Sequence, residues 1–221
     1  MQMNRGMLKE MLSWVFFTVA ALDLIGVGLG LQWMQVVFKP LITISLILLY
    51  LASSEKRNSL YLSALVFSFL GDVFLLDKND FFLFGVGAFL IAQLFYIVLV
   101  RRNSPDLGQR SLLMAAPPFI VYLILLMSLL MPGLGTLKYP VLVYGMVISV
   151  FGITALQNQI TRRNASSGIL LVGAVLFIVS DSLIAINKFV EPHMVYPVAI
   201  MLTYVLAQYF IYRYVISTEQ S

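Results

Sequence analysis

Long apolar stretches alternate along this chain with short polar breaks. A helix that crosses a membrane needs about 20 predominantly apolar residues, and each stretch is close to that length. The breaks predict eight helices, over residues 11–29, 34–52, 59–76, 81–100, 111–131, 139–157, 167–187 and 195–215. We therefore expect an all-α polytopic membrane protein in which residues 1–221 form a single domain of eight transmembrane helices.

The composition excludes a soluble protein. Of the 221 residues, 61% are hydrophobic and only 11% are charged, whereas soluble domains contain about 45–50% apolar and ~25% charged residues. The first apolar run follows Arg5 and Lys9, as in a signal peptide. Because that run is long and lacks a small-residue cleavage pattern, we expect a retained first helix. The absence of cysteine excludes disulfides, thiolate metal sites and thiol nucleophiles.

The basic residues predict an orientation in the membrane. If both termini lie on one side, ten of the 14 Lys and Arg residues fall on that side: Arg5, Lys9, Lys56, Arg57, Arg101, Arg102, Arg110, Arg162, Arg163 and Arg213. The other side receives Lys39, Lys78, Lys138 and Lys188. This excess predicts cytoplasmic N- and C-termini, in the inner or plasma membrane if the chain is bacterial. The net charge of +4 is too small and scattered to suggest nucleic-acid binding.

Weak matches between the two halves of the chain suggest an internal repeat. The segment 68–72 resembles 177–181, and the helices that follow carry similar segments at 92–96 and 207–210. Two parallel four-helix repeats, with possible halves 1–106 and 107–221, would be related by an axis along the membrane normal. Asp72 and Asp181 would then face each other at the same depth. The alternative is coincidence among apolar sequences.

Three aspartates interrupt the apolar runs: Asp23, Asp72 and Asp181. An ionised carboxylate at the centre of a membrane helix costs about 2.5–3.5 kcal/mol, so such residues usually mark a functional site. All three fall in the outer half of their helices under the predicted orientation, which predicts one polar pocket open to the outer side. The alternative is an interhelical ion pair, such as Asp72 with Lys39, that only holds helices together.

Further polar residues accompany these aspartates. Four of them share the outer half of the predicted helices: Lys39, Tyr144, Asn187 and Lys188. Four others lie on the fourth and eighth helices, where they either hydrogen-bond the aspartates or bond across helices: Gln93, Tyr96, Tyr204 and Gln208. The only histidine, His193, follows Pro192 in a short loop, and we interpret it as a solvated loop residue. With one histidine and no cysteine, neither a metal nor another cofactor is expected.

Two short motifs, Gly71-Asp72 and Ser180-Asp181, are the most specific parts of a pattern that covers almost the whole chain. Its other parts are Lys39-Pro40, Phe84-Gly85, Phe89, Tyr96, Val143-Tyr144, residues 173–177, Lys188-Phe189, Tyr204 and Gln208. This pattern resembles the YhhN family, whose characterised animal members are lysoplasmalogenases. Many members carry Ala-His where this chain has Ala92-Gln93. Because glutamine does not titrate, any relay role of that histidine is lost or moved here.

The resemblance implies eight transmembrane helices and hydrolysis of the vinyl ether bond of lysoplasmalogens, which releases a fatty aldehyde and a glycerophospho-ethanolamine or -choline. That reaction begins with protonation of an alkene carbon and passes through an oxocarbenium ion. Burial and mutual repulsion of two carboxyls in one pocket keep one protonated and leave the other ionised. We therefore predict Asp72 and Asp181 as the catalytic pair, in an order that the sequence does not assign.

The remaining polar residues are predicted to bind the substrate: Lys39, Gln93, Tyr144, Asn187, Lys188, Tyr204 and Gln208. Lys39 or Lys188 would contact the lipid phosphate, and the hydrocarbon chain would lie between helices. The expected partners are a lysophospholipid of the lysoplasmalogen type and membrane lipids, with the oligomeric state left open. Two alternatives are a proton-coupled transporter of lipids or small molecules and a non-catalytic protein that binds lysolipids.

Overall fold

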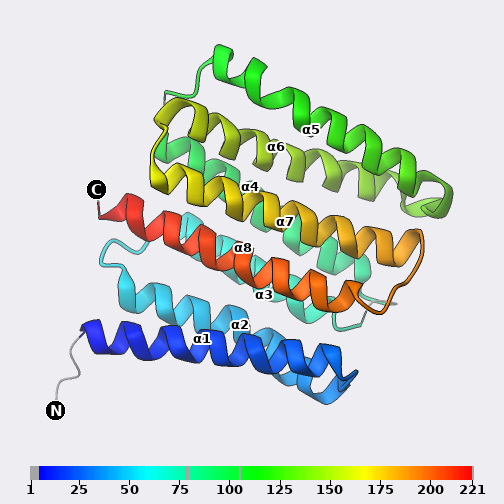
Figure 1. Ribbon diagram of the computed structural model, residues 1–221, viewed down its shortest axis with the longest axis horizontal. Helices are drawn as coiled ribbons and strands as arrows, with labels where there is room; N and C mark the ends of the chain where they lie inside the picture. Colours follow the sequence, from blue (N-terminus) through cyan, green and yellow to red (C-terminus); the bar gives the residue numbers. More distant parts are fainter. Residues whose placement is uncertain (1–4, 78–79, 105, 221) are drawn as a thin grey trace. The chain divides into compact units, whose positions relative to one another are not determined.

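The computed structural model describes residues 5–77, 80–104 and 106–220, which fold into eight α-helices and two short 3-10 helices (Figure 1). The α-helices are α1 (Arg5–Gly28), α2 (Gln32–Ser53), α3 (Ser59–Phe74), α4 (Phe82–Asn103), α5 (Gln109–Leu130), α6 (Lys138–Arg162), α7 (Ala165–Phe189) and α8 (Tyr196–Glu219). The 3-10 helices, η1 (Met131–Gly133) and η2 (Gly135–Leu137), connect α5 to α6. The eight predicted helices are thus confirmed, with ends shifted by a few residues. Lys78, which was assigned to the outer side, lies outside the described residues.

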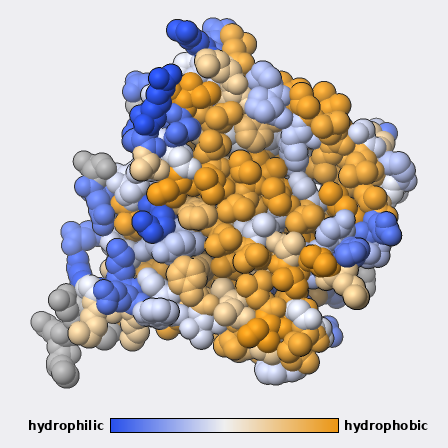
Figure 2. Space-filling model, viewed as in Figure 1, coloured by the Kyte–Doolittle hydropathy of each residue, from blue (hydrophilic) through white to orange (hydrophobic). Residues whose placement is uncertain are grey.

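Within the described chain, seven of the helices are long and apolar enough to cross a membrane. Only α3 is shorter: its 16 residues extend over about 24 Å at 1.5 Å per residue. Large apolar side chains such as Trp14, Ile124 and Leu125 are more than half exposed. Figure 2 shows hydrophobic side chains over the middle of the helices and hydrophilic ones near their ends. The chain is therefore an integral, multi-pass membrane protein.

The chain divides into two compact units. Unit 1 comprises Met1–Ala92 and Val215–Ser221, and unit 2 comprises Gln93–Tyr214. The boundaries fall inside α4 and α8, so each of these helices contributes residues to both units. The predicted repeat with halves 1–106 and 107–221 stays a prediction.

In unit 1, α1 and α2 form a tight helical hairpin, and α3 packs against α2. The turn contains Gly30, whose φ of +67° lies in the left-handed region that glycine enters without steric cost. A Cβ at Gly26 would collide with Met34, so a small residue here permits the close approach of the two helices. Asn58 caps the start of α3, and its side chain accepts a hydrogen bond from the Leu60 backbone N–H at 3.0 Å.

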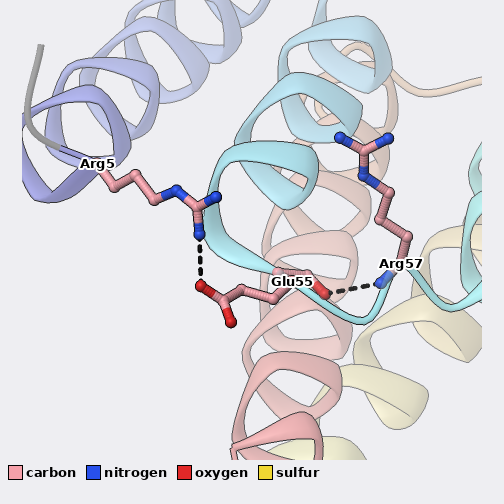
Figure 3. Close-up of polar contacts among 4 residues, drawn as sticks. Arg5, Glu55 and Arg57 are labelled. Carbon is pink, nitrogen blue, oxygen red and sulfur yellow. Dashed lines mark hydrogen bonds and ion pairs between the residues drawn. The ribbon is translucent and has the colours of Figure 1, made fainter. Parts of the chain in front are cut away.

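Both ends of the described chain contact the same end of unit 1. Arg5, at the start of α1, forms an exposed ion pair with Glu55 in the loop between α2 and α3 (Figure 3). Near the end of α8, Glu219 accepts hydrogen bonds from the Tyr50 hydroxyl at 2.6 Å and the Ser54 hydroxyl at 2.5 Å. Glu219 thus joins the end of α8 to the end of α2 within unit 1.

In unit 2, α6 lies beside both α5 and α7 (Figure 1). Helix α7 begins with a capping box, in which Asn164 accepts a hydrogen bond from the Ser167 backbone N–H at 2.8 Å and Ser167 Oγ accepts one from the Asn164 backbone N–H at 3.3 Å. Helix α5 packs closely on α6, because a Cβ at Gly152 would collide with the Phe119 ring. These three helices position the second of the two aspartates.

Candidate functional site

Asp72 lies near the end of α3 in unit 1 and is only 1% exposed. The Thr43 hydroxyl on α2 donates a hydrogen bond to Asp72 Oδ2 at 2.7 Å. Ser68, one helical turn before Asp72, is also buried, and its hydroxyl has no hydrogen-bond partner among the described residues. Gly71 faces the Phe89 ring of α4, with which a Cβ would collide. The Asp72 carboxyl is therefore held in a tightly packed part of unit 1 and accepts a hydrogen bond from a neighbouring helix.

Lys39 lies one turn before Thr43 on α2, so its ammonium and the Thr43 hydroxyl share a face of the helix. The side chain of Lys39 is half-buried and interacts electrostatically with Asp23 on α1. Asp23 is fully buried, and neither of its carboxylate oxygens has a hydrogen-bond partner in the described part of the chain. A buried charge is retained most readily beside an opposite charge, and Lys39 is the cation that acts on the Asp23 carboxyl.

Asp181 lies on α7 in unit 2 and is half-buried. The Tyr144 hydroxyl on α6 donates a hydrogen bond to Asp181 Oδ2, and the Gln93 side chain lies near that hydroxyl. On α5, Tyr122 interacts electrostatically with Asp181, and its hydroxyl lies 2.8 Å from Ser182 Oγ. Helices α5 and α6 thus bring tyrosine hydroxyls toward the Asp181 carboxyl, and such donors suit an anionic carboxyl.

Tyr96 on α4 is hydrogen-bonded to two polar residues of α8, Gln208 and, through it, Tyr204. Tyr96 donates a hydrogen bond to Gln208 Oε1 at 2.8 Å, and Gln208 Nε2 donates one to the Tyr204 hydroxyl at 3.3 Å. The first of these bonds crosses from α4 to α8, and the second lies within α8. The resulting chain of polar side chains is buried, so its donors and acceptors satisfy each other.

The C-terminal end of α7 carries the other predicted substrate-binding residues. Asn187 Oδ1 accepts a hydrogen bond from the His193 backbone N–H at 3.2 Å and so shapes the loop before α8. His193 is exposed in that loop. Lys188 is exposed in the last turn of α7, seven residues after Asp181. At 1.5 Å per residue, this spacing places the lysine backbone about 10 Å farther along the helix axis.

Three residues near the aspartates were missed by sequence reasoning: Thr43, Tyr122 and Ser182. Thr43 carries a weak signal, because its spacing of four residues from Lys39 places both on one helix face. The Tyr122–Ser182 contact has no comparable signal, since its members are 60 residues apart in the chain and meet only when α5 packs against α7.

This fold and these side chains define a class of polytopic membrane proteins with carboxyl groups held inside apolar helices. Within that class, the chain belongs to the YhhN family, which it matches over residues 34–215. The predicted resemblance is thus confirmed for the region from α2 to α8. Helix α1, which carries Asp23, precedes the matched region.

Curated relatives of this chain include lysoplasmalogenases. It is 34% identical to human lysoplasmalogenase TMEM86A over 154 residues, which cover 65% of this chain and 60% of the human protein. It is 33% identical to the lysoplasmalogenases of Mycobacterium bovis and Mycobacterium tuberculosis over 133 residues, or 58% of this chain and 48% of each relative. The matches therefore span about half to three fifths of the length of these relatives. No solved structure matches the chain.

Proposed function

We propose that this chain is a membrane-embedded hydrolase that cleaves the vinyl ether bond of lysoplasmalogens. The observation that carries the proposal is the pair of membrane-helix aspartates, each bonded to a hydroxyl from a neighbouring helix. Relatives named lysoplasmalogenase support the choice of substrate. In this proposal, Asp72 and Asp181 share the acid and base chemistry.

The reaction starts when the protonated aspartate transfers its proton to the alkene carbon remote from the ether oxygen. A C–H bond forms, and the second, ionised aspartate stabilises the oxocarbenium ion that results. Water then bonds to the cationic carbon and loses a proton to that second aspartate, as in glycoside hydrolysis. The hemiacetal collapses when its hydroxyl returns a proton to the first aspartate, while the glycerol oxygen leaves with the proton of the second. One water is consumed, and both carboxyls regain their starting states.

The surrounding side chains support this chemistry in two ways. The hydroxyls of Thr43 and Tyr144 hold the carboxyls by hydrogen bonds, and the ammonium group of Lys39 or Lys188 is proposed to bind the anionic phosphate of the headgroup. The other proposed substrate contacts are Gln93, Asn187, Tyr204 and Gln208. With cytoplasmic termini, the headgroup enters from the outer side of the membrane.

The test compares the purified protein with its Asp72→Asn and Asp181→Asn variants in detergent. Each variant is expected to release aldehyde from lysoplasmalogen at least about 100-fold more slowly, the lower end of the usual effect of a general acid or base. The double variant should lose little more than either single variant, because residues that act as one catalytic unit are non-additive. Full activity of either single variant, with unchanged elution from a sizing column, would overturn the assignment.

An ester-linked lysophospholipid serves as the substrate control and should release no aldehyde. Detergent also separates the hydrolase from the transporter alternative, because no gradient exists there to drive transport. Aldehyde release in detergent supports the hydrolase. Its absence, together with substrate-dependent flux into proteoliposomes, would favour the transporter.

A further inference from the structure

A groove with a volume of about 300 Å³ opens between α5 and α7 in unit 2. Its α7 side consists of residues spaced as one face of a helix: Val175, Ile178, Val179, Ser182 and Leu183. This volume is at the lower end of the roughly 300–1,000 Å³ typical of small-molecule sites. The lining is apolar apart from two hydroxyl groups, so the groove suits a hydrocarbon ligand.

The two hydroxyl groups in the groove, those of Tyr122 and Ser182, satisfy each other. Ser182 Oγ donates a hydrogen bond to the Ile178 carbonyl at 2.6 Å, so the Tyr122 hydroxyl, 2.8 Å away, donates to Ser182 Oγ. Hydroxyl groups with such partners do not need a polar ligand. They do mark the polar end of the groove, because Ser182 directly follows Asp181 and Tyr122 interacts electrostatically with that carboxyl.

The order of features along α7 matches the order of groups in a lysoplasmalogen. The groove lining on α7 begins at Val175, and Asp181 follows six residues later, beside the last lining residues, Ser182 and Leu183. Lys188 comes seven residues after Asp181. At 1.5 Å per residue, these steps are about 9 Å and about 10 Å along the axis. The lipid presents in turn a hydrocarbon chain, a vinyl ether, a glycerol and a charged phosphate. One helix therefore offers an apolar surface, an acid and a cation in the sequence that this lipid requires.

The wall of the groove formed by α5 is tightly packed at Phe119. Phe119 lines it and is buried, and the ring is packed on the bare backbone of Gly152 in α6. A packed apolar wall discriminates between ligands by their length and shape. A ligand that is too large clashes with the wall, and its affinity falls. The length of the hydrocarbon chain is therefore the property that this groove should sense.

We propose that the groove between α5 and α7 holds the hydrocarbon chain of the lysolipid substrate and guides its vinyl ether to Asp181. This proposal rests on the proposed function, since it takes the occupant to be the substrate. The occupant is a single aliphatic chain, and its headgroup lies toward Lys188. A bilayer lipid that fills the groove without selectivity is the competing outcome.

The test narrows the groove with Val175→Phe, at the end remote from Asp181. The matched control is Val172→Phe on the same helix, because Val172 is similarly exposed (48% against 41% for Val175) and does not line the groove. For Val175→Phe, kcat/KM should fall at least about tenfold for a long-chain lysoplasmalogen, the scale of discrimination by apolar pockets. A short-chain lysoplasmalogen should be hydrolysed at the parental rate. Val172→Phe should match the parent protein for both.

Binding of a long-chain alkyl ether lysophospholipid, which has no vinyl group to protonate, separates this proposal from the proposed function. Weaker binding to Val175→Phe than to Val172→Phe supports the groove even if the protein hydrolyses nothing. Equal binding and equal long-chain hydrolysis by both variants would overturn the groove proposal. Bilayer lipid would then be the occupant of the groove. Val175→Leu, a milder change, should give a smaller loss in the same direction. If Val175→Phe does not fold, a parental profile for Val175→Leu would overturn the proposal.

Discussion

The Tyr144 hydroxyl is the group that donates a hydrogen bond to the Asp181 carboxyl from α6. Tyr144 itself is half-buried, and its hydroxyl faces the carboxyl. A hydrogen bond to a charged group contributes about 1.5–3 kcal/mol. If this contribution is greatest in the transition state, its loss lowers the rate without weakening lipid binding.

Tyr144→Phe tests this role. We expect kcat to fall about 10- to 100-fold, the rate equivalent of the lost hydrogen bond, while KM changes little. Tyr139→Phe is the matched control, because Tyr139 lies on the same helix but is 76% exposed. The measurement is steady-state aldehyde release at several substrate concentrations. An unchanged kcat in Tyr144→Phe would show that this hydroxyl has no part in the reaction.

At the scale of helices, glycines beside the site control how closely the elements pack. Gly71 precedes Asp72 on α3, and a Cβ there would meet three atoms of the Phe89 ring on α4. Gly87 lies on α4 with no atom within 4 Å of an added Cβ. The two glycines therefore differ in their surroundings although both lie within helices.

Gly71→Ala should lower the free energy of unfolding by about 1–3 kcal/mol, because the Phe89 ring must move to admit the methyl group. Gly87→Ala should be neutral or stabilising, since alanine favours helix over glycine by about 0.8–1.0 kcal/mol. Thermal unfolding in detergent measures both effects. Equal melting temperatures for the two variants would contradict the close contact between Gly71 and Phe89.

The helices could be predicted from the sequence because crossing hydrocarbon demands a long apolar run. Their ends were less predictable. Helix α6 continues five residues past its predicted end to Arg162, and α7 starts two residues early, after the Asn164 cap. Hydropathy marks the part of a helix that lies in lipid, whereas the backbone stays helical until a cap or turn satisfies its last donors and acceptors.

At the scale of the whole molecule, the orientation in the membrane can be tested because the chain has no cysteine. Met194, in the loop between α7 and α8, is 90% exposed, and Lys56, in the loop between α2 and α3, is also exposed. We predict that a membrane-impermeant maleimide labels Met194→Cys in intact cells. Lys56→Cys should be labelled only after permeabilisation, because it lies on the side with most of the basic residues.

The cysteine-free parent protein gives the background of this experiment. If only Lys56→Cys is labelled in intact cells, the orientation is the opposite of the predicted one. It would also move the proposed headgroup site at Lys188 to the cytoplasmic side. The result therefore decides which leaflet supplies the lysolipid.

The sequence by itself determined that the chain is embedded in a membrane and that it forms eight helices. It also determined which aspartates interrupt the apolar runs. These follow from local properties, since hydropathy and helical period belong to consecutive residues. Only the tertiary structure decided which groups each aspartate contacts. Thr43 meets Asp72 across 29 residues of chain, and Tyr144 meets Asp181 across 37. Such contacts, and the groove between α5 and α7, arise from the packing of distant helices, which no local pattern encodes.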